Sequence, residues 1–286
     1  MTAPTTDDVE IRRIAASDAI LDVAVSGPSD ARCVVLLHGW PHTWELWRPV
    51  GSALAAHGHR VIAPNLRGIG GGERPSGRVD AAVVAGDVLG VMTALGVETA
   101  TVVGIDAGVP PAVYAAARAP SRVDRLVVME GVLPGVPGAE KFFAAGPPWW
   151  FGFHAIPGLA ETVVEGHEDD YLGWFLTGPS VRHDIGADAR RAFVSAYRGK
   201  DALRAGFELY RASDRNARLF REAFAANRLT MPVLSVEGGV VGDALSGQLA
   251  GIADDLTCTT VPDCGHLIPL EKPRELTEAL VDAIGP

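Results

Sequence analysis

The chain has 286 residues, of which 48% are hydrophobic and 21% charged, and its formal net charge at pH 7 is −10. This balance excludes an intrinsically disordered or fibrous chain. The acidic charge argues against nucleic acid or an anionic membrane as a partner, because no basic surface is available to attract phosphates. The length approaches two domains of about 150 residues, although α/β folds of about 200–250 residues often form one domain.

The sequence also gives an expectation for the cellular location of the protein. No apolar run approaches the roughly 18–20 residues that a membrane helix needs. Residues 1–8 contain neither a basic nor an apolar segment, so we expect no secretory signal peptide. The three cysteines, Cys33, Cys258 and Cys264, are too few and too scattered for a disulfide framework or a metal site. We therefore expect a cytoplasmic protein with reduced thiols.

Apolar runs recur along the chain, each bounded by turn residues, as is typical of strands buried on both faces of a parallel sheet. Helical patterns alternate with these runs, which indicates a mostly parallel α/β sheet. Strands are expected at 9–14, 20–26, 32–37, 60–63, 101–105, 125–129, 232–236 and 258–261, and helices at 81–95, 108–119, 244–253 and 273–283.

One region, 134–221, breaks this alternation. It carries no buried-strand pattern, it is rich in aromatic residues, and it opens with a segment of prolines and glycines typical of a linker. Ligands of open α/β sheets bind at the carboxyl edge of the strands. We therefore predict a core formed by 1–133 and 222–286, with a helical cap at 134–221 inserted over that edge.

The segment 104–108 reads Gly-Ile-Asp-Ala-Gly and lies between an apolar strand and an alanine-rich helix. This is the spacing of a nucleophile elbow, with Asp106 in the place where a serine is commoner. Gly104 and Gly108 suit a turn too tight for side chains beside the nucleophile. The helix that follows directs backbone N–H groups toward a developing oxyanion. The alternative is that Asp106 only caps the helix, since aspartate is favoured there.

Two further segments strengthen the catalytic interpretation of Asp106. His38, Gly39, Trp40 and Pro41 follow a predicted strand, where a backbone N–H group can complete an oxyanion hole. His266 lies just after the last predicted strand and follows the nucleophile in chain order, as this type of fold requires.

Three carboxylates are candidates for the acid that orients His266. Glu130 directly follows a buried strand, and a carboxylate there is costly unless it is paired. Asp243 and Glu237 lie in the turn after the strand at 232–236, which is the usual place for this acid. We favour Glu130, with Asp243 second and Glu237 third.

The motifs HGWP at 38–41, PNLRG at 64–68, GIDAG at 104–108 and DCGH at 263–266 resemble those of the Asp-nucleophile branch of the α/β-hydrolase superfamily. This branch contains epoxide hydrolases and haloalkane or haloacetate dehalogenases. The resemblance covers residues 11–284. It implies an α/β-hydrolase fold: a mostly parallel eight-stranded sheet flanked by helices, with an inserted helical cap. Some members carry the triad acid where this chain has Glu130.

An Asp nucleophile attacks an sp³ carbon and forms an alkyl ester, which a water activated by His266 then hydrolyses. The backbone N–H groups of Trp40 and Ala107 are the expected oxyanion hole. Four further side chains are expected to contact the substrate: His38, Pro41, Trp44 and Phe153.

The leaving group distinguishes an epoxide from a carbon–halogen bond, because an opening epoxide needs a proton donor such as a phenol. Epoxide hydrolases place a cap tyrosine in a Phe-x-x-Tyr-Arg context, and the segment 207–211 matches it with Tyr210. Where the family has a second Tyr or His donor, this chain has Trp150 beside Trp149. An indole cannot act as an acid at neutral pH, so this pair would hydrogen-bond the oxygen, stack on a flat substrate or only pack.

The residues after the nucleophile differ from those of the dehalogenases. Haloalkane dehalogenases usually have a tryptophan where this chain has Ala107, and haloacetate dehalogenases have arginines where it has Gly108, Val109 and Pro110. The tryptophan pair suggests a bulky, polycyclic aromatic epoxide. In this the chain is similar to atypical epoxide hydrolases of bacterial aromatic-polyketide biosynthesis.

The sequence therefore predicts an epoxide hydrolase that uses no metal and no organic cofactor and acts on a small-molecule epoxide as a monomer or homodimer. Hydrolytic dehalogenation, with the indole pair holding the halide, is one alternative. The other is a member of the fold that binds a ligand without turning it over.

Overall fold

The structure is a computed structural model that describes residues 9–72 and 79–285. Residues 1–8, on which the expected absence of a signal peptide depends, lie outside the described residues. Eight strands form one sheet in the order β1-β2-β4-β3-β5-β6-β7-β8, antiparallel at β1–β2 and β2–β4 and parallel elsewhere. The predicted mostly parallel eight-stranded sheet is thus confirmed. The strands are β1 (Glu10–Ala16), β2 (Ala19–Ser26), β3 (Cys33–Leu37), β4 (Arg60–Pro64), β5 (Ala100–Ile105), β6 (Val123–Met129), β7 (Val233–Glu237) and β8 (Leu256–Thr260).

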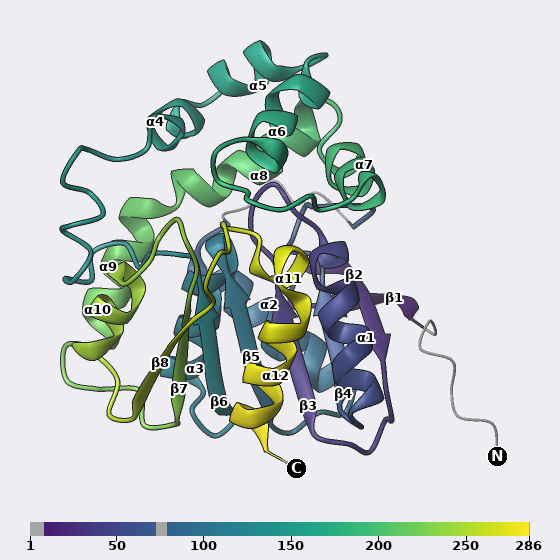
Figure 1. Ribbon diagram of the computed structural model, residues 1–286, viewed down its shortest axis with the longest axis vertical. Helices are drawn as coiled ribbons and strands as arrows, with labels where there is room; N and C mark the ends of the chain where they lie inside the picture. Colours follow the sequence, from purple (N-terminus) through teal and green to yellow (C-terminus); the bar gives the residue numbers. More distant parts are fainter. Residues whose placement is uncertain (1–8, 73–78, 286) are drawn as a thin grey trace.

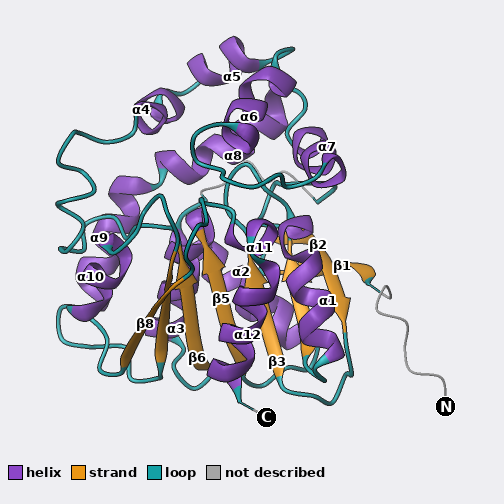
Figure 2. Cartoon of the chain, viewed as in Figure 1, coloured by secondary structure: helices purple, strands orange, loops and turns teal. Residues whose placement is uncertain are grey.

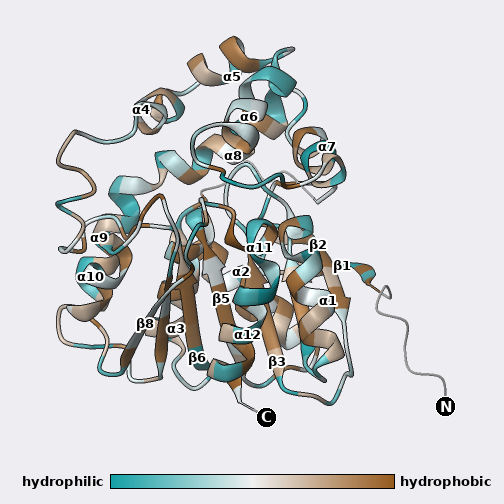
Figure 3. Cartoon of the chain, viewed as in Figure 1, coloured by the Kyte–Doolittle hydropathy of each residue, from teal (hydrophilic) through white to brown (hydrophobic). Residues whose placement is uncertain are grey.

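Alternate residues of the central strands pack into two separate hydrophobic clusters. In β3, Val34 and Leu36 join one cluster, whereas Val35 and Leu37 join the other. The first cluster includes residues of α1 (Arg48–Ala56) and α12 (Pro273–Ile284), and the second includes residues of α2 (Ala81–Ala94), α3 (Val109–Arg118) and α10 (Ala244–Ala250). Helices therefore cover both faces of the sheet (Figure 2). This is why the central strands β3, β4 and β5 are continuously buried and largely apolar (Figure 3) rather than alternating.

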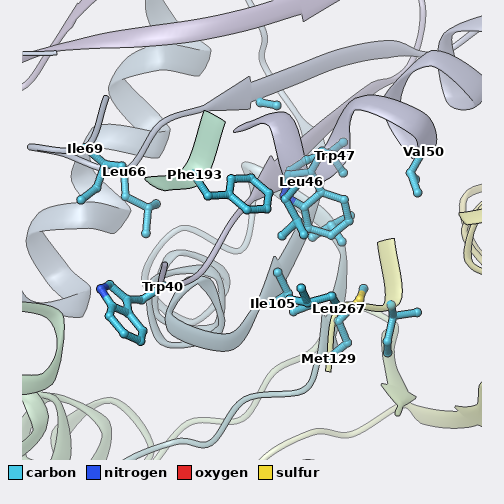
Figure 4. Close-up of a cluster of buried hydrophobic side chains, with 14 of the residues drawn as sticks. Trp40, Leu46, Trp47, Val50, Leu66, Ile69, Ile105, Met129, Phe193 and Leu267 are labelled. Atoms are coloured by element: carbon cyan, nitrogen blue, oxygen red, sulfur yellow. The ribbon is translucent and has the colours of Figure 1, made fainter. Parts of the chain in front are cut away.

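The strands that lead into the motifs end in the first of these clusters. Ile105 and Met129, the last residues of β5 and β6, are fully buried there together with the ring of Trp40 (Figure 4). Asp106 directly follows β5 and Glu130 directly follows β6. The close packing at the ends of these strands therefore holds both residues in place.

The chain between β6 and β7 forms helices in its described structure. Most of them lie beyond the carboxyl ends of the strands (Figure 1). None of the helices in 9–72 and 79–285 is both long and apolar enough to cross a membrane. The helices of this segment are α4 (Trp149–Ala155), α5 (Leu159–Val164), α6 (Glu168–Thr177), α7 (Ala187–Ala196), α8 (Lys200–Arg211) and α9 (Ser213–Ala223).

The predicted cap boundary at residue 221 falls inside α9. That helix packs against α2 and α3 of the core, where the rings of Tyr114 and Phe220 have centroids 6.2 Å apart. The apolar side of α9 is thus buried on helices of the predicted core. The division into core and cap stays a prediction. Three short helices complete the fold: two 3₁₀ helices, Trp44–Trp47 and Asp106–Gly108, and α11 (Ile268–Glu271).

Candidate active site

Asp106 stands at the sharp turn between β5 and α3. Its φ angle is +52°, a left-handed conformation that is uncommon for any residue except glycine. The turn needs a glycine on either side, because a Cβ on Gly104 would lie 2.6 Å from the carbonyl oxygen of Gly108. A Cβ on Gly108 would lie 2.6 Å from the carbonyl oxygen of Leu37 in β3. The sequence-predicted elbow geometry is therefore present, and strain at this residue is typical of functional sites.

Two groups hold the carboxylate of Asp106. The backbone N–H of Trp40 donates to Oδ1 at 2.8 Å. The Nε2 atom of His266 lies 3.3 Å from Oδ2. The structure therefore brings the predicted nucleophile, base and oxyanion-hole residue into direct contact. Ala107, the other expected oxyanion-hole residue, lies with Asp106 in the wall of the same cavity.

Glu130 lies on the other side of the His266 ring. Its Oε2 atom is 3.1 Å from Nδ1 of His266, and its side chain is fully buried. The backbone N–H groups of Gly238 and Val241 donate to Oε1 at 3.0 Å and to Oε2 at 3.1 Å. Three donors thus converge on one buried carboxylate, which offsets the cost of removing it from water.

The other two candidate acids have different partners. Asp243 is 72% exposed and lies 3.7 Å from Lys141. The Oε1 atom of Glu237 accepts a hydrogen bond from the hydroxyl of Ser246 at 2.6 Å. Of the three carboxylates considered, Glu130 is the one that contacts His266.

The charges of the two carboxylates control the protonation of His266. Burial alone would lower the pKa of His266, but hydrogen bonds to Asp106 and Glu130, together with their charges, outweigh it and raise the pKa to about 10. Burial likewise opposes the charged form of Asp106, but its hydrogen bond to His266 keeps its pKa below the usual value. At neutral pH the site therefore holds an Asp106 carboxylate paired with an imidazolium.

The sequence did not single out His42, which the structure places beside this pair. His42 lies in the cavity wall and is 1% exposed, and its ring centroid is 6.5 Å from that of His266. Burial lowers the pKa of His42 to about 3, although the charge of Asp106 opposes the shift. Its ring packs against Phe193 of α7. A neutral histidine thus supports the loop that carries Trp40, a role that only the packed structure reveals.

A cavity of about 370 Å³ opens above Asp106 between the sheet edge and the helical segment. Tyr210 and Trp150, both predicted from the sequence, lie in its wall, as does Pro41. Burial, together with the charge of Asp106, raises the pKa of Tyr210 well above 10, so its phenol is neutral and able to donate. The wall also contains several apolar side chains that the sequence did not indicate, among them Phe142, Phe151, Phe175, Leu209 and Val241.

Four residues expected to contact the substrate are absent from the cavity wall, and each has a different environment. His38 is fully buried, its Nδ1 donating to the carbonyl oxygen of Gly39 and its Nε2 accepting from the N–H of Leu66. The guanidinium of Arg48 lies 4.6 Å from the ring centroid of Trp44. His38 and Trp44 therefore have a structural role in place of the expected contact with the substrate.

The other two belong to α4. Trp149 is 55% exposed and its ring contacts that of Trp174, while Phe153 packs on Trp149 and Tyr171. The side of α4 that lines the cavity carries Trp150, Phe151 and Ala155. Consecutive residues of a helix point about 100° apart, and Trp149 lies off that side, so its placement does not support direct contact with the leaving oxygen.

A buried aromatic cluster, missed in the sequence, lies behind Tyr210. The ring of His154 stacks on Phe207 and meets Tyr210 edge-on, with centroid distances of 4.3 Å and 4.5 Å. Its Nε2 atom lies 2.7 Å from the hydroxyl oxygen of Tyr171. Burial lowers the pKa of His154 to about 3, so this ring is neutral. The cluster fixes the tyrosine ring through packing.

No group of three His, Cys, Asp or Glu side chains within 9–72 and 79–285 is arranged to hold a metal ion. The site that the described residues form is thus a carboxylate–histidine–carboxylate row in the wall of an aromatic cavity. Such a row can supply a nucleophile, a base and an orienting acid.

The fold and this row are those of a hydrolase, and comparison with known proteins agrees. Residues 32–273 match the family described as the alpha/beta hydrolase fold, and the chain belongs to that family. It is 30% identical over 274 residues to the soluble epoxide hydrolase of Corynebacterium sp. (strain C12), covering 88% of this chain and 90% of that protein.

Solved structures give the same result. The wild-type Cfl2 structure from Burkholderia cenocepacia superposes with a TM-score of 0.88 at 29% identity, covering 98% of this chain and 97% of the other. The ligand-free epoxide hydrolase CorEH superposes with a TM-score of 0.86 at 26% identity, covering 97% and 99%. The chain is an α/β hydrolase with epoxide hydrolases among its relatives.

Proposed function

We propose that the protein is an epoxide hydrolase that opens its substrate to a vicinal diol through a covalent ester on Asp106. The observation that carries the proposal is the position of Asp106. It lies in the cavity wall within reach of His266, and Tyr210 lies in the same wall. The names of relatives such as the soluble epoxide hydrolase of Corynebacterium support the same activity.

In the first step, a carboxylate oxygen of Asp106 attacks an epoxide carbon, and the carbon–oxygen bond of the ring breaks with its electron pair on oxygen. Tyr210 donates a proton to that oxygen. The lowered pKa of Asp106 keeps the nucleophile ionised, and the raised pKa of Tyr210 keeps the donor protonated. Trp150 supplies an indole N–H to the same oxygen, as a hydrogen-bond donor and not as an acid.

Formation of the ester prepares the second step. The alkylated Asp106 carries no charge, so two of the causes that raise the pKa of His266 vanish. The imidazolium then gives up its proton, which passes through solvent to the Tyr210 phenolate and restores the phenol. His266 then accepts a proton from water, which attacks the ester carbonyl carbon of Asp106. The backbone N–H groups of Trp40 and Ala107 stabilise the oxyanion, and Glu130 stabilises the imidazolium. The imidazolium returns its proton to the departing alkoxide, which gives the diol. The carboxylic acid left on Asp106 then transfers its proton to His266, which restores the starting ion pair.

The cavity favours a bulky, aromatic substrate. Its volume of about 370 Å³ suits a molecule of several rings. Trp150 and Phe175 have ring centroids 5.5 Å apart, and Phe151 and Tyr210 form a second edge-to-face pair at 5.5 Å. Such rings offer flat apolar surfaces for an aromatic ligand. We propose a polycyclic aromatic epoxide of bacterial secondary metabolism as substrate, acted on in the cytoplasm.

The test is the intact mass of a His266→Gln variant mixed with aryl epoxides and with haloalkanes. Without its base the ester cannot be hydrolysed and should accumulate. A gain equal to the whole substrate means epoxide opening, because no group leaves. A gain equal to the substrate minus hydrogen halide means dehalogenation and contradicts the proposal. His167→Gln, which changes an exposed histidine in the same way, should give turnover and no adduct.

A further inference from the structure

One buried polar side chain in the cavity wall has no part in the proposed chemistry. Asn216, in α9, is 6% exposed and lines the cavity together with Asp80 and Ala81 at the start of α2. Its Oδ1 atom accepts a hydrogen bond of 2.8 Å from the backbone N–H of Ala81. Its Nδ2 group has no hydrogen-bond partner among the residues that the structure describes. This nitrogen is not one of the sealed polar atoms that lack a partner, so it is open to the cavity and can take a partner there.

The orientation of the Asn216 amide follows from its one partner. A backbone N–H can only donate, so the atom facing Ala81 must be the oxygen. The NH₂ group then occupies the other side of the amide plane. Because Asn216 is in the cavity wall, this donor is available to a molecule bound in the cavity. The hydrogen bond from Ala81 thus holds the amide of Asn216 in place and leaves its NH₂ group without a partner in the described part of the chain.

The packing of α9 places this donor relative to Asp106. Both α3 and α9 start at the carboxyl edge of the sheet, since α3 follows β5 and α9 leads down to the beginning of β7 (Figure 1). The rings of Tyr114 and Phe220 are in contact between the two helices. Pro110 and Asn216 each precede those residues by four positions, one helical turn, and both line the cavity. Asn216 therefore reaches the cavity beside the first turn of α3. Pro110, on that turn, is four residues and about 6 Å along the chain direction of the helix from Asp106.

We propose that Asn216 determines specificity by donating a hydrogen bond to an oxygen substituent of the substrate, a carbonyl or a hydroxyl, about one ring width or more from the epoxide. The inference rests on the proposed function and narrows its substrate class to oxygen-substituted aromatic epoxides. The carboxylate of Asp80 lines the same end of the cavity and lies 3.5 Å from Nε of Arg215. A hydroxyl could donate to this carboxylate while accepting from Asn216, whereas a carbonyl would use Asn216 alone.

Asn216→Asp tests the donor with little change in shape. The carboxylate keeps an oxygen for the N–H of Ala81 and removes the NH₂ group. The substrates are 2-(2-naphthyl)oxirane and its derivatives that carry one hydroxyl or one acetyl group at successive positions of the distal ring. For each protein we compare kcat/KM of each derivative with that of the parent oxirane.

The wild type should prefer at least one derivative over the parent, and Asn216→Asp should lower that preference about tenfold or more, the effect expected when a buried donor is lost. Asn227→Asp makes the same change on an exposed asparagine near the end of α9 and should leave the preference unchanged. Asn216→Ala, which adds no charge, should behave as Asn216→Asp does. If the preference is the same in wild type and in both Asn216 variants, or absent from the wild type, the inference is overturned.

A binding measurement separates this inference from the proposed function. In an Asp106→Asn background, quenching of tryptophan fluorescence reports ligands beside Trp150 without requiring turnover. Tighter binding of the hydroxyl or acetyl derivative than of the parent, lost on Asn216→Asp, supports the subsite even if no epoxide is opened. Equal binding of derivative and parent contradicts it even if the epoxides are hydrolysed.

Discussion

The Oε2 atom of Glu130 lies 3.1 Å from Nδ1 of His266, while the same carboxylate accepts hydrogen bonds from the backbone N–H groups of Gly238 and Val241. All three neighbours are donors. The carboxylate therefore fixes both the orientation of the imidazole and the loop that follows β7. Its charge matters most when His266 takes a proton from water.

Replacing Glu130 with glutamine should slow hydrolysis of the ester more than its formation. A glutamine turns its NH₂ group toward one of three donors and supplies no charge to the imidazolium. We expect ester hydrolysis to fall by about 10²–10⁴-fold, so that the alkyl-enzyme becomes visible by mass spectrometry during turnover. Glu237→Gln, which changes a carboxylate bonded to Ser246, should stay near wild type. Equal losses in both variants would contradict the role of Glu130.

The ion pair of His266 should make the stability of the fold depend on pH. The pKa of His266 is raised from 6.5 to about 10, so the folded state binds its proton more tightly than the unfolded state. The resulting stabilisation is complete below pH 6.5 and is lost as pH rises toward 10. The pKa of Asp106 is instead lowered, so its contribution is lost only as pH falls below 3.8.

Urea titrations at pH values from 6 to 10 measure this contribution. The free energy of unfolding of the wild type should fall more steeply across that interval than that of His266→Gln, whose side chain does not titrate. Burial raises the pKa of the thiols of Cys33 and Cys264 to about 12 in the folded state, so the cysteines also contribute to the pH dependence. They are common to both proteins and cancel in the difference. Parallel curves for the two proteins would exclude a strong ion pair at His266.

The sequence predicted those parts of the fold and site that depend on local pattern. Both faces of β3, β5 and β6 are covered, so their apolar runs could be recognised without the partners. Asp106 and His266 were indicated by their glycine-containing turns, and Glu130 by the cost of leaving a carboxylate unpaired at the end of a buried strand.

What depends on remote contacts could not be predicted. The sequence cannot set the rotation of α4, so it did not show that Trp150 faces the cavity while Trp149 rests on Trp174. His42 gained its role from Phe193 of α7, more than 100 residues away, and Asn216 from the N-terminus of α2. Helix α1 begins with a proline at one of its first two positions, was not predicted, and is stabilised by packing on α12.

The elbow glycines give a prediction about stability. In Gly108→Ala the new Cβ would lie 2.6 Å and 2.7 Å from the carbonyl oxygens of Leu37 and His38, which are backbone atoms that cannot easily move. We expect a loss of about 1–3 kcal/mol. In Gly86→Ala, within α2, the Cβ would meet only the hydroxyl of Ser17 at 3.5 Å, and stability should rise by about 0.5–1 kcal/mol. Thermal melts of the two variants should therefore shift in opposite directions.

Tyr210 is expected to act as the proton donor in ring opening, and Tyr171 provides a matched control. Tyr210→Phe removes a hydroxyl from the cavity wall, whereas Tyr171→Phe removes one that contacts His154 outside that wall. Loss of a general acid slows the step it serves by about 10²–10⁴-fold. We expect this loss in ester formation by Tyr210→Phe, measured by single-turnover mixing, and a much smaller effect of Tyr171→Phe.

Because burial and the charge of Asp106 raise the pKa of Tyr210 well above 10, the wild-type rate of ester formation should show no decline from phenol ionisation up to pH 10. A decline near pH 10 that is absent from Tyr210→Phe would mean that the phenol is more exposed than the structure indicates, and equal rates in the two variants would assign the proton to another group.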